Sequence, residues 1–362
     1  MTKVNRSILL EKIRGYSSID TTVSCRVHEV YIMLTLECNL KCAFCCWWGP
    51  NGPCRNPLFL KKYSPPANRR DIKRFIDEVA VFRPKTVNLS GGEPLIFDGW
   101  HDIALYLKRK EMPVSLTTNG LLLPAQSDKI HESVDDLNIS FQGAPGSNIH
   151  NYMDMLKKGL KRLSKLKKIK NRGPKIRILY TLTGQTCGLF KKFRRFLKQE
   201  AIHVDSMIFQ HRLFINDKTL KDHRAVFKKE FGILNTDFTR GFASHGITNG
   251  LASFKKHLKD IRTDAAGRFV PNLLDSEIDA YYNENEPPAH YSVYCSAPWH
   301  QVNLLPNGVI YTCNDYMLGN ITKAYFPDIW NGPKARRLRK FISRRLFPAC
   351  KGCFYYYTDR DA

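Results

Sequence analysis

A long hydrophobic run is missing from this sequence. Its longest largely apolar stretch, residues 30–36, spans seven residues, whereas a helix that crosses a bilayer needs roughly 20. Near the N-terminus, Ile8-Leu9-Leu10 has charged residues on both sides, so the continuous apolar centre of a secretory signal is missing as well. We therefore expect no membrane span and a cytoplasmic location.

Acidic residues are few. The chain of 362 residues has 33 Asp and Glu against 57 Lys and Arg, a formal net charge of +24. A field of this sign attracts anions, so an anionic substrate, an acidic peptide or a nucleic acid is admissible and the charge selects none of them. The longest basic run, residues 157–177, is most simply a solvated helix face, and no recognisable nucleic-acid-binding module accompanies it. We therefore allow an anionic substrate and do not expect a nucleic acid as the partner.

Low-complexity segments and internal repeats are also missing. Hydrophobic residues make up 43% and charged residues 25% of the chain, values that are ordinary for globular proteins and that exclude collagen-like, mucin-like and disordered classes. The length allows one large α/β domain with a smaller one beside it.

Short apolar runs alternate with stretches of helical period between residues 29 and 209. This alternation is typical of βα units around a parallel sheet. Six units are too few to close an eight-stranded barrel. We predict an α/β fold, a partial (β/α)6 TIM-like barrel with ligands at the C-terminal ends of its strands. The predicted strands are residues 30–36, 86–89, 114–118, 137–141, 176–182 and 204–209.

The remaining pattern suggests further segments around this barrel. Two helices are expected at residues 218–231 and 251–261, within a less regular stretch. A hairpin is expected at residues 301–312, where Pro306-Asn307-Gly308 separates two apolar runs. The predicted division is an N-terminal extension (1–27), the partial barrel (28–211), a connector (212–288) and a small cysteine-rich domain (289–362).

Eleven cysteines in a cytoplasmic chain indicate metal or thiol chemistry, because that compartment keeps thiols reduced. Cys38, Cys42 and Cys45 form a CxxxCxxC loop directly after the first predicted strand. Three thiolates in one loop can bind three irons of a [4Fe–4S] cluster and leave the fourth iron open for a substrate or cofactor. The alternative is a zinc loop, completed by Cys46 or Cys54.

This loop, with Phe44 just before its last cysteine, resembles the signature of the radical S-adenosylmethionine (SAM) superfamily. In that family the open iron binds the amino and carboxylate groups of SAM, and an electron from the cluster cleaves SAM to a 5′-deoxyadenosyl radical. The resemblance continues in Ser90-Gly91-Gly92-Glu93-Pro94 after the second predicted strand and in Thr117-Thr118-Asn119-Gly120 after the third. Each motif alone is an ordinary turn; their order along successive strands is what favours radical chemistry.

The resemblance also implies the SAM contacts. The glycines would bring the backbone close to the methionine part of SAM, and Glu93 would fix that backbone or the ammonium group. Gln142 departs from the family pattern, since many relatives have Asp there. The implied SAM-binding residues are Phe44, Gly91, Gly92, Glu93, Pro94, Asn119, Ser140 and Gln142.

Four further cysteines form a second constellation. Cys295 and Cys313 stand apart, and Cys350 and Cys353 form a CxxC pair; together they could hold one metal or cluster, including the zinc of a zinc ribbon. The segment resembles the SPASM and twitch extensions of radical SAM enzymes, which bind auxiliary [4Fe–4S] clusters. Because the sequence runs only nine residues beyond Cys353, we expect one auxiliary cluster, as in the twitch arrangement.

The resemblance implies an oxidoreductase with two [4Fe–4S] clusters and SAM. A substrate that loses a hydrogen atom and then an electron to the auxiliary cluster is oxidised by two electrons, which gives a dehydrogenation or a crosslink. The implied substrate is a peptide or a sugar-like natural-product precursor. The implied partners are an external one-electron reductant of the flavodoxin or ferredoxin type and, because the N-terminal extension is short, a separate peptide-recognition protein.

Two alternatives remain open. Cys187, after the fifth predicted strand, could return a hydrogen atom to the substrate radical, which would make the enzyme a redox-neutral epimerase; a simple packed cysteine is the competing interpretation. From another class, the chain could be a non-enzymatic protein that binds metal and nucleic acid.

Overall fold

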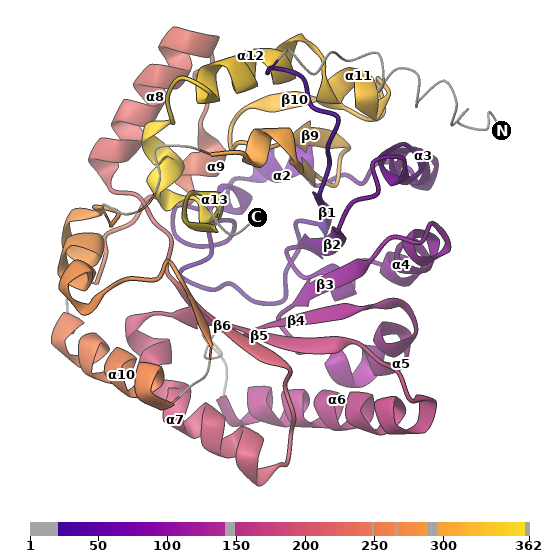
Figure 1. Ribbon diagram of the computed structural model, residues 1–362, viewed down its shortest axis with the longest axis vertical. Coiled ribbons are helices and arrows are strands. Elements are labelled where there is room, and N and C mark those ends of the chain that lie inside the picture. Colours follow the sequence, from indigo (N-terminus) through magenta and orange to yellow (C-terminus); the bar gives the residue numbers. More distant parts are fainter. Residues whose placement is uncertain are drawn as a thin grey trace.

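The computed structural model describes residues 21–141, 149–247, 250–264, 267–288, 291 and 295–358. Within these ranges ten strands form one curved, open sheet in the order β10-β9-β8-β1-β2-β3-β4-β5-β6-β7, with α3 to α7 along its outer side (Figure 1). The six predicted strands are present as β1 to β6 and pair in parallel, so the predicted partial barrel is confirmed. The strands are β1 Glu29–Thr35, β2 Thr86–Gly91, β3 Val114–Thr118, β4 Asp136–Phe141, β5 Lys175–Leu182, β6 Ser206–His211, β7 Arg268–Val270, β8 Gln301–Leu304, β9 Val309–Tyr311 and β10 Met317–Asn320.

Helices connect the strands and cover the outer face of the barrel. The two helices predicted in the connector are confirmed as α8 and α10. None of the helices in the described ranges is both long and apolar enough to cross a membrane. The helices are α2 Pro57–Tyr63, α3 Arg69–Ala80, α4 Trp100–Arg109, α5 Leu123–Ser133, α6 Ile149–Lys170, α7 Gly184–Gln199, α8 Asp217–Phe231, α9 Asp237–Arg240, α10 Leu251–Asp264, α11 Phe326–Trp330, α12 Pro333–Ile342 and α13 Phe354–Thr358.

Both edges of the barrel carry strands that the sequence did not predict as part of it. β7 pairs in parallel with β6. The predicted hairpin is present as β8 and β9, but β8 also pairs in parallel with β1, with Glu29 opposite Gln301 and Ile32 opposite Leu304. β10 then adds to β9 in antiparallel fashion. Three strands of the cysteine-bearing C-terminal segment therefore extend the barrel sheet.

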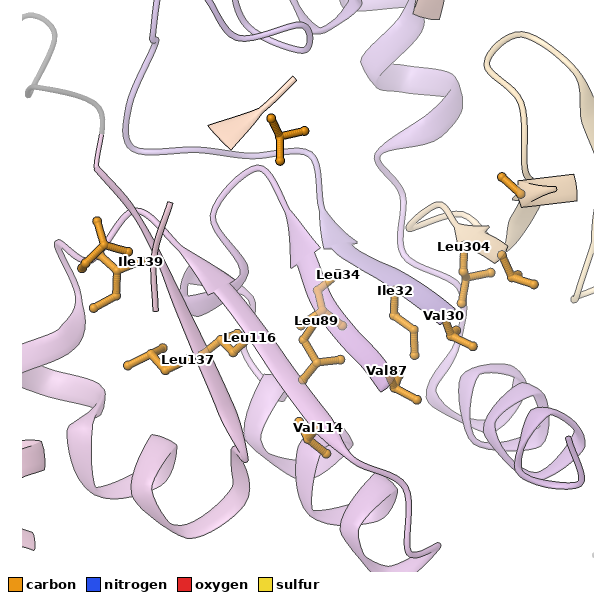
Figure 2. Packing of buried hydrophobic residues seen from close by; sticks show 14 of the residues in the cluster. Val30, Ile32, Leu34, Val87, Leu89, Val114, Leu116, Leu137, Ile139 and Leu304 are labelled. Atoms are coloured by element: carbon orange, nitrogen blue, oxygen red, sulfur yellow. The ribbon is translucent and has the colours of Figure 1, made fainter. Parts of the chain in front are cut away.

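Alternation along the central strands separates an apolar outer face from a polar inner face. The residues that face the helices are fully buried, and Figure 2 shows them packed across β1 to β4 and β8. On the inner face, the Asn88 amide donates to Thr117 (3.0 Å) and the Asn138 amide donates to Ser115 (2.8 Å). The labelled apolar residues are Val30, Ile32, Leu34, Val87, Leu89, Val114, Leu116, Leu137, Ile139 and Leu304.

Glu78 joins the barrel to the C-terminal segment. It lies on α3 with 1% of its surface exposed, and its Oε2 accepts a hydrogen bond of 2.5 Å from the backbone N–H of Phe326 in α11. Burial raises the pKa of Glu78 from 4.5 to about 7. Between these pH values the native state holds a proton that the unfolded state has released, so the free energy of unfolding falls as pH rises through this window.

We expect the substitution Glu78→Gln to remove this part of the pH dependence. A pKa rise of this size corresponds to at most about 3 kcal/mol, and glutamine keeps an oxygen that can accept the Phe326 hydrogen bond. The variant should therefore be more stable than the wild type above pH 7 and similar to it near pH 4.5. Urea unfolding across this range measures the difference, and parallel pH profiles for the two proteins would contradict it.

Candidate functional site

The CxxxCxxC loop begins where β1 ends. Cys42 is buried, and Cys38 and Cys45 are half-buried. Backbone hydrogen bonds from Cys45 N to Cys42 O (3.1 Å) and from Gly49 N to Cys45 O (2.7 Å) tighten the loop. The Cys38 sulfur accepts a further bond of 3.4 Å from the Leu40 amide. The chain therefore presents the three thiols from one compact turn.

The three thiols differ in how readily they ionise. Burial raises the pKa of Cys38, and burial together with the charges of the other two thiols raises the pKa of Cys42 to about 12. The pKa of Cys45 is held below its usual value because its sulfur accepts hydrogen bonds from the Cys46 thiol and from the backbone amides of Trp47 and Trp48. Cys45 is thus the readiest thiolate, the form that binds iron.

Cys46 and Cys54 are the alternative ligands of a zinc loop. Cys46 hydrogen-bonds to Cys45, whereas Cys54 is 1% exposed and packs in an apolar cluster with Phe59 and Phe238. Among the residues that the structure describes, no three Cys, His, Asp or Glu side chains converge tightly enough to hold a single metal ion. The donor set, three thiols in one loop, fits an iron–sulfur cluster, in which each iron takes one thiolate.

Gly91 and Gly92 lie against the chain that leads into the cysteine loop. A Cβ on Gly91, whose φ is +130°, would lie 2.2 Å from the Thr35 carbonyl oxygen, and a Cβ on Gly92 would lie 2.0 Å from that of Glu37. The Gly92 amide donates to Thr35 O and the Glu93 amide to Glu37 O, each at 2.8 Å. Glycine is therefore required at both positions because two backbone segments approach each other closely there. This role was not predicted from the sequence.

Glu93 is fully buried, and both oxygens of its carboxylate accept hydrogen bonds from the protein. Oε1 accepts hydrogen bonds from the Leu95 amide (3.2 Å) and the Thr118 hydroxyl (2.7 Å), and Oε2 accepts one from the Asn119 amide (2.8 Å). Burial raises its pKa, and these three bonds oppose the rise. Glu93 was expected to fix either the backbone or the ammonium group of SAM, and these bonds are of the first kind.

Asn119 extends this network to the cysteine loop. Its side-chain amide donates to Asn39 Oδ1 at 2.7 Å, and its backbone carbonyl accepts a bond of 2.9 Å from the Tyr152 hydroxyl. Tyr152 also donates to the Ser140 carbonyl at 3.2 Å. Neither Asn39 nor Tyr152 was predicted from the sequence, although Asn39 stands between two predicted ligands. The ends of β1, β2, β3 and β4 are thereby linked around one site.

The other predicted SAM contacts lie around this network. Phe44 is half-buried within the loop, Pro94 is buried at the start of the short turn Pro94–Ile96, and Ser140 is half-buried near the end of β4. Gln142 lies outside the described residues.

Cys187 lies in the first turn of α7, with 2% of its surface exposed. It packs in the main apolar core, and burial raises the pKa of its thiol. It is not among the residues that line the cavity described next. This burial favours the interpretation of Cys187 as a packed cysteine.

The second set of cysteines surrounds one cavity. Cys295, Cys313 and the CxxC pair Cys350 and Cys353 come from three points of the C-terminal segment and line a cavity of about 330 Å³. Burial raises the pKa of Cys313 well above its usual value, and the charges of the other three thiols add to this rise. Four thiols around one mostly apolar space fit a fully protein-ligated [4Fe–4S] cluster.

The same cavity reaches the first cysteine loop. Cys46 and Trp47 line it on that side, Gln210 lines it from the end of β6, and Asn303 and Tyr311 line it from the hairpin. The cavity therefore extends from the four C-terminal cysteines to Cys46, the neighbour of Cys45, and we refer to it as the cavity between the thiols. The sequence analysis did not foresee this shared lining, because Gln210 and Asn303 belong to strands without a motif.

The basic run at residues 334–345 is only partly a solvated face. Arg339 is 1% exposed, and its guanidinium donates to the carbonyl oxygens of Pro298 (2.8 Å) and Thr22 (3.0 Å). Burial lowers the pKa of Arg339 to about 9. In α6, by contrast, Lys157 and Lys161 both pair with Glu200 at the surface.

Comparison with known families agrees with this arrangement of thiols. Residues 32–197 match the model of the radical SAM superfamily, and residues 295–354 match that of an iron–sulfur cluster-binding domain, SPASM. The chain belongs to the radical SAM superfamily. It is a radical SAM enzyme with a C-terminal SPASM-type domain, and the non-enzymatic alternative is set aside.

Curated relatives match this radical SAM enzyme over part of its length. It is 31% identical over 153 residues to the GTP 3′,8-cyclase of Clostridium perfringens (42% of this chain and 40% of that protein). It is 31% identical over 146 residues to a probable GTP 3′,8-cyclase of Pyrococcus horikoshii (39% and 44%). The chain thus spans less than half the length of these curated relatives.

Solved structures share the fold over most of the chain. Streptococcus suis SuiB bound to its precursor peptide SuiA matches with a TM-score of 0.58 and 16% identity, covering 92% of this chain and 70% of SuiB. A tagged anSMEcpe with bound AdoMet matches with a TM-score of 0.52 and 15% identity, covering 92% and 91%. At these identities the likeness concerns the fold.

Proposed function

We propose that this radical SAM enzyme is an oxidoreductase that removes two electrons from a peptide or a sugar-like natural-product precursor, by dehydrogenation or crosslinking. The observation that carries the proposal is the cavity between the two sets of thiols. With the auxiliary cluster at its four cysteines, a substrate at the Cys46 side of the cavity would lie between the two clusters, which is what a reaction in two one-electron steps requires.

The proposed cofactors are two [4Fe–4S] clusters and SAM. Cys38, Cys42 and Cys45 hold the first cluster, and Cys295, Cys313, Cys350 and Cys353 hold the second. When bound, these groups supply the one-electron chemistry that takes a hydrogen atom and then an electron from the substrate. The proposed SAM site comprises Phe44, Gly91, Gly92, Glu93, Pro94, Asn119, Ser140 and Gln142.

The residues of this chain prepare the site in two ways. The bonds among Glu93, Asn119 and Asn39 fix the loop that carries the thiols before any ligand arrives. The cavity wall is mostly apolar, with Trp47 and Tyr311 among its side chains, and this keeps water from a reactive substrate. The amide groups of Gln210 and Asn303 supply hydrogen bonds that orient a polar group of the substrate.

A peptide is the substrate class that we favour. The structurally similar SuiB is described as bound to a precursor peptide, and its likeness covers 92% of this chain. The proposed boundaries are 28–211 for the radical SAM barrel, 212–288 for the connector and 289–362 for the SPASM/twitch-like domain. The proposed partners are a one-electron reductant and a separate peptide-recognition protein, in the cytoplasm.

Turnover in deuterated water tests the oxidation against epimerisation. An oxidation exports an electron and a proton and adds nothing to the reacting carbon, so the product should carry no solvent deuterium there. Because the Cys187 thiol is 2% exposed, Cys187→Ala should keep at least about half of the turnover. Mass spectrometry of the product and its yield per 5′-deoxyadenosine measure both.

The opposite result would replace the proposal. Deuterium at the reacting carbon of the wild-type product, together with loss of that product in Cys187→Ala, would make Cys187 the hydrogen donor of an epimerase.

A further inference from the structure

A second hollow lies on the surface near the first cysteine loop. It has a volume of about 460 Å³ and is lined by α2, by the segment between α8 and α9, by α9, by β10 and by the first turn of α12. These elements gather in the upper part of the view in Figure 1. It shares Phe238 with the cavity between the thiols, and the proposed function uses none of its other lining residues.

The charged residues that are exposed at the rim of this hollow are lysines, although its lining also includes two acids. Lys62 and Lys334 are exposed at it, and neither forms an ion pair with a residue in the described ranges. The two acids of the lining are already engaged. Asp237 pairs with Arg240 at 3.4 Å, and the buried Asp315 accepts hydrogen bonds of 2.9 and 3.0 Å from two backbone amides of α9.

Exposed leucines stand beside these lysines. Leu58 lines the hollow and is 74% exposed, and Leu234 lies between the lining residues Ile233 and Asn235 and is 75% exposed. Exposed large apolar side chains grouped around one hollow are a feature of surfaces that bind another protein. The positive rim selects a partner whose own surface is acidic.

The floor of the hollow is aromatic and leads to the first cysteine loop. The ring of Phe59 lies 4.7 Å from that of Tyr63 and 5.3 Å from that of Phe238, measured between centroids. The Trp47 ring lies 5.3 Å from Phe238. Since Trp47 is the second residue after the proposed ligand Cys45, packed rings connect the floor to the cluster loop.

The same floor also leads to the auxiliary cysteines. The Phe238 ring lies 5.7 Å from that of Tyr311, which is the second residue before Cys313. Both Phe238 and Tyr311 line the cavity between the thiols as well. Phe238 therefore stands between the surface hollow and the two proposed cluster sites.

We propose that this hollow is the docking site of an acidic one-electron carrier protein. This proposal rests on the proposed function of the enzyme. The carrier places its redox group over Phe59, Tyr63 and Phe238, with its acidic surface on Lys62 and Lys334 and an apolar patch on Leu58. One electron passes from the reduced carrier to the cluster held by Cys38, Cys42 and Cys45. The carrier is oxidised by one electron, the cluster is reduced by one, and no atom is transferred.

The test compares two reductants on the reconstituted enzyme. Lys62→Glu with Lys334→Glu reverses the rim charge, so reduction by flavodoxin at low salt should slow at least about tenfold, and flavodoxin binding should weaken. Reduction by dithionite, which is small and needs no docking surface, should be unchanged. Electron paramagnetic resonance of the reduced cluster and titration calorimetry measure the two effects. High salt should slow the wild type toward the variant.

The matched control is Lys165→Glu with Lys168→Glu, the same charge change on the exposed face of α6. Flavodoxin should reduce the cluster of this variant at a rate within about twofold of that of the wild type. Leu58→Asp changes no lysine. It should slow the reduction of the cluster by flavodoxin and leave its reduction by dithionite unchanged. Unchanged flavodoxin reduction in the rim variant, or an equal loss in the α6 control, would overturn the docking site. A wild type that dithionite reduces but that never cleaves SAM would instead overturn the proposed function.

Discussion

Replacing Cys38, Cys42 and Cys45 together by alanine will reduce the cleavage of SAM to background. These are the three thiols that the loop after β1 presents from one turn, and without thiolates the first cluster has no ligands from the protein. None of the four cysteines of the C-terminal segment belongs to this loop, so their cluster should remain. Iron should fall from about eight to about four per chain, with visible absorbance retained. Chromatography of 5′-deoxyadenosine measures the loss.

Cys46→Ala is the matched control, because it removes a thiol from the same loop. In the cluster assignment Cys46 is no ligand, so this variant should keep the iron and most of the cleavage. In the zinc alternative Cys46 could be the fourth ligand, and its loss would be as severe as that of the other three. Cleavage that survives in the triple variant would show that the two cysteine sets have been assigned wrongly.

The substitution Gly92→Ala will prevent the turn after β2 from closing on the cysteine loop. The added methyl group would lie 2.0 Å from the carbonyl oxygen of Glu37 and 2.8 Å from that of Leu36, and both obstacles are backbone. The turn must move away, which strains the bonds from Gly92 N to Thr35 O and from Glu93 N to Glu37 O. We expect a loss of about 3 kcal/mol or more in the free energy of unfolding, together with a loss of SAM binding of at least about tenfold.

Gly184→Ala is the control for this experiment. Gly184 is the first residue of α7, and an added Cβ there would meet no atom within 4 Å. Alanine should leave stability unchanged or raise it by up to about 1 kcal/mol, since it restricts the unfolded chain and favours the helix. Urea unfolding measures stability, and calorimetry with SAM measures binding. Equal behaviour of the two alanine variants would show that the close approach at Gly92 is not needed.

The central strands could be predicted from the sequence because their alternation is local. The alternation of Val30, Ile32 and Leu34 predicts a strand with one buried face, and this prediction does not depend on the neighbouring strands. The strands at the edges of the sheet, and the partners with which they pair, could not be predicted in this way. β7 has three residues, Arg268–Val270, too few for a period to be visible. The pairing of β8 with β1 joins distant segments, and nothing in either segment alone encodes it.

The site could be predicted as a set of residues but not as a set of contacts. The spacing of Cys38, Cys42 and Cys45 identifies candidate ligands, since one loop must carry all three. The partners of Glu93 depend on how β2 and β3 lie side by side, and so only the structure supplies Thr118 and Asn119. Cys187 illustrates the converse, because its position after β5 suggested the substrate side while its first-turn orientation in α7 buries it.

The pairing of β8 with β1 affects how the protein is made. Glu29 lies opposite Gln301, so the first strand to leave the ribosome waits for a partner about 270 residues later. At ordinary rates of translation this delay is on the order of tens of seconds. Until then, one edge of β1 has unpaired backbone groups next to reactive thiols, an edge on which another chain could pair. Slow growth at low temperature, with chaperones that shield nascent strands, should therefore improve the yield of folded enzyme.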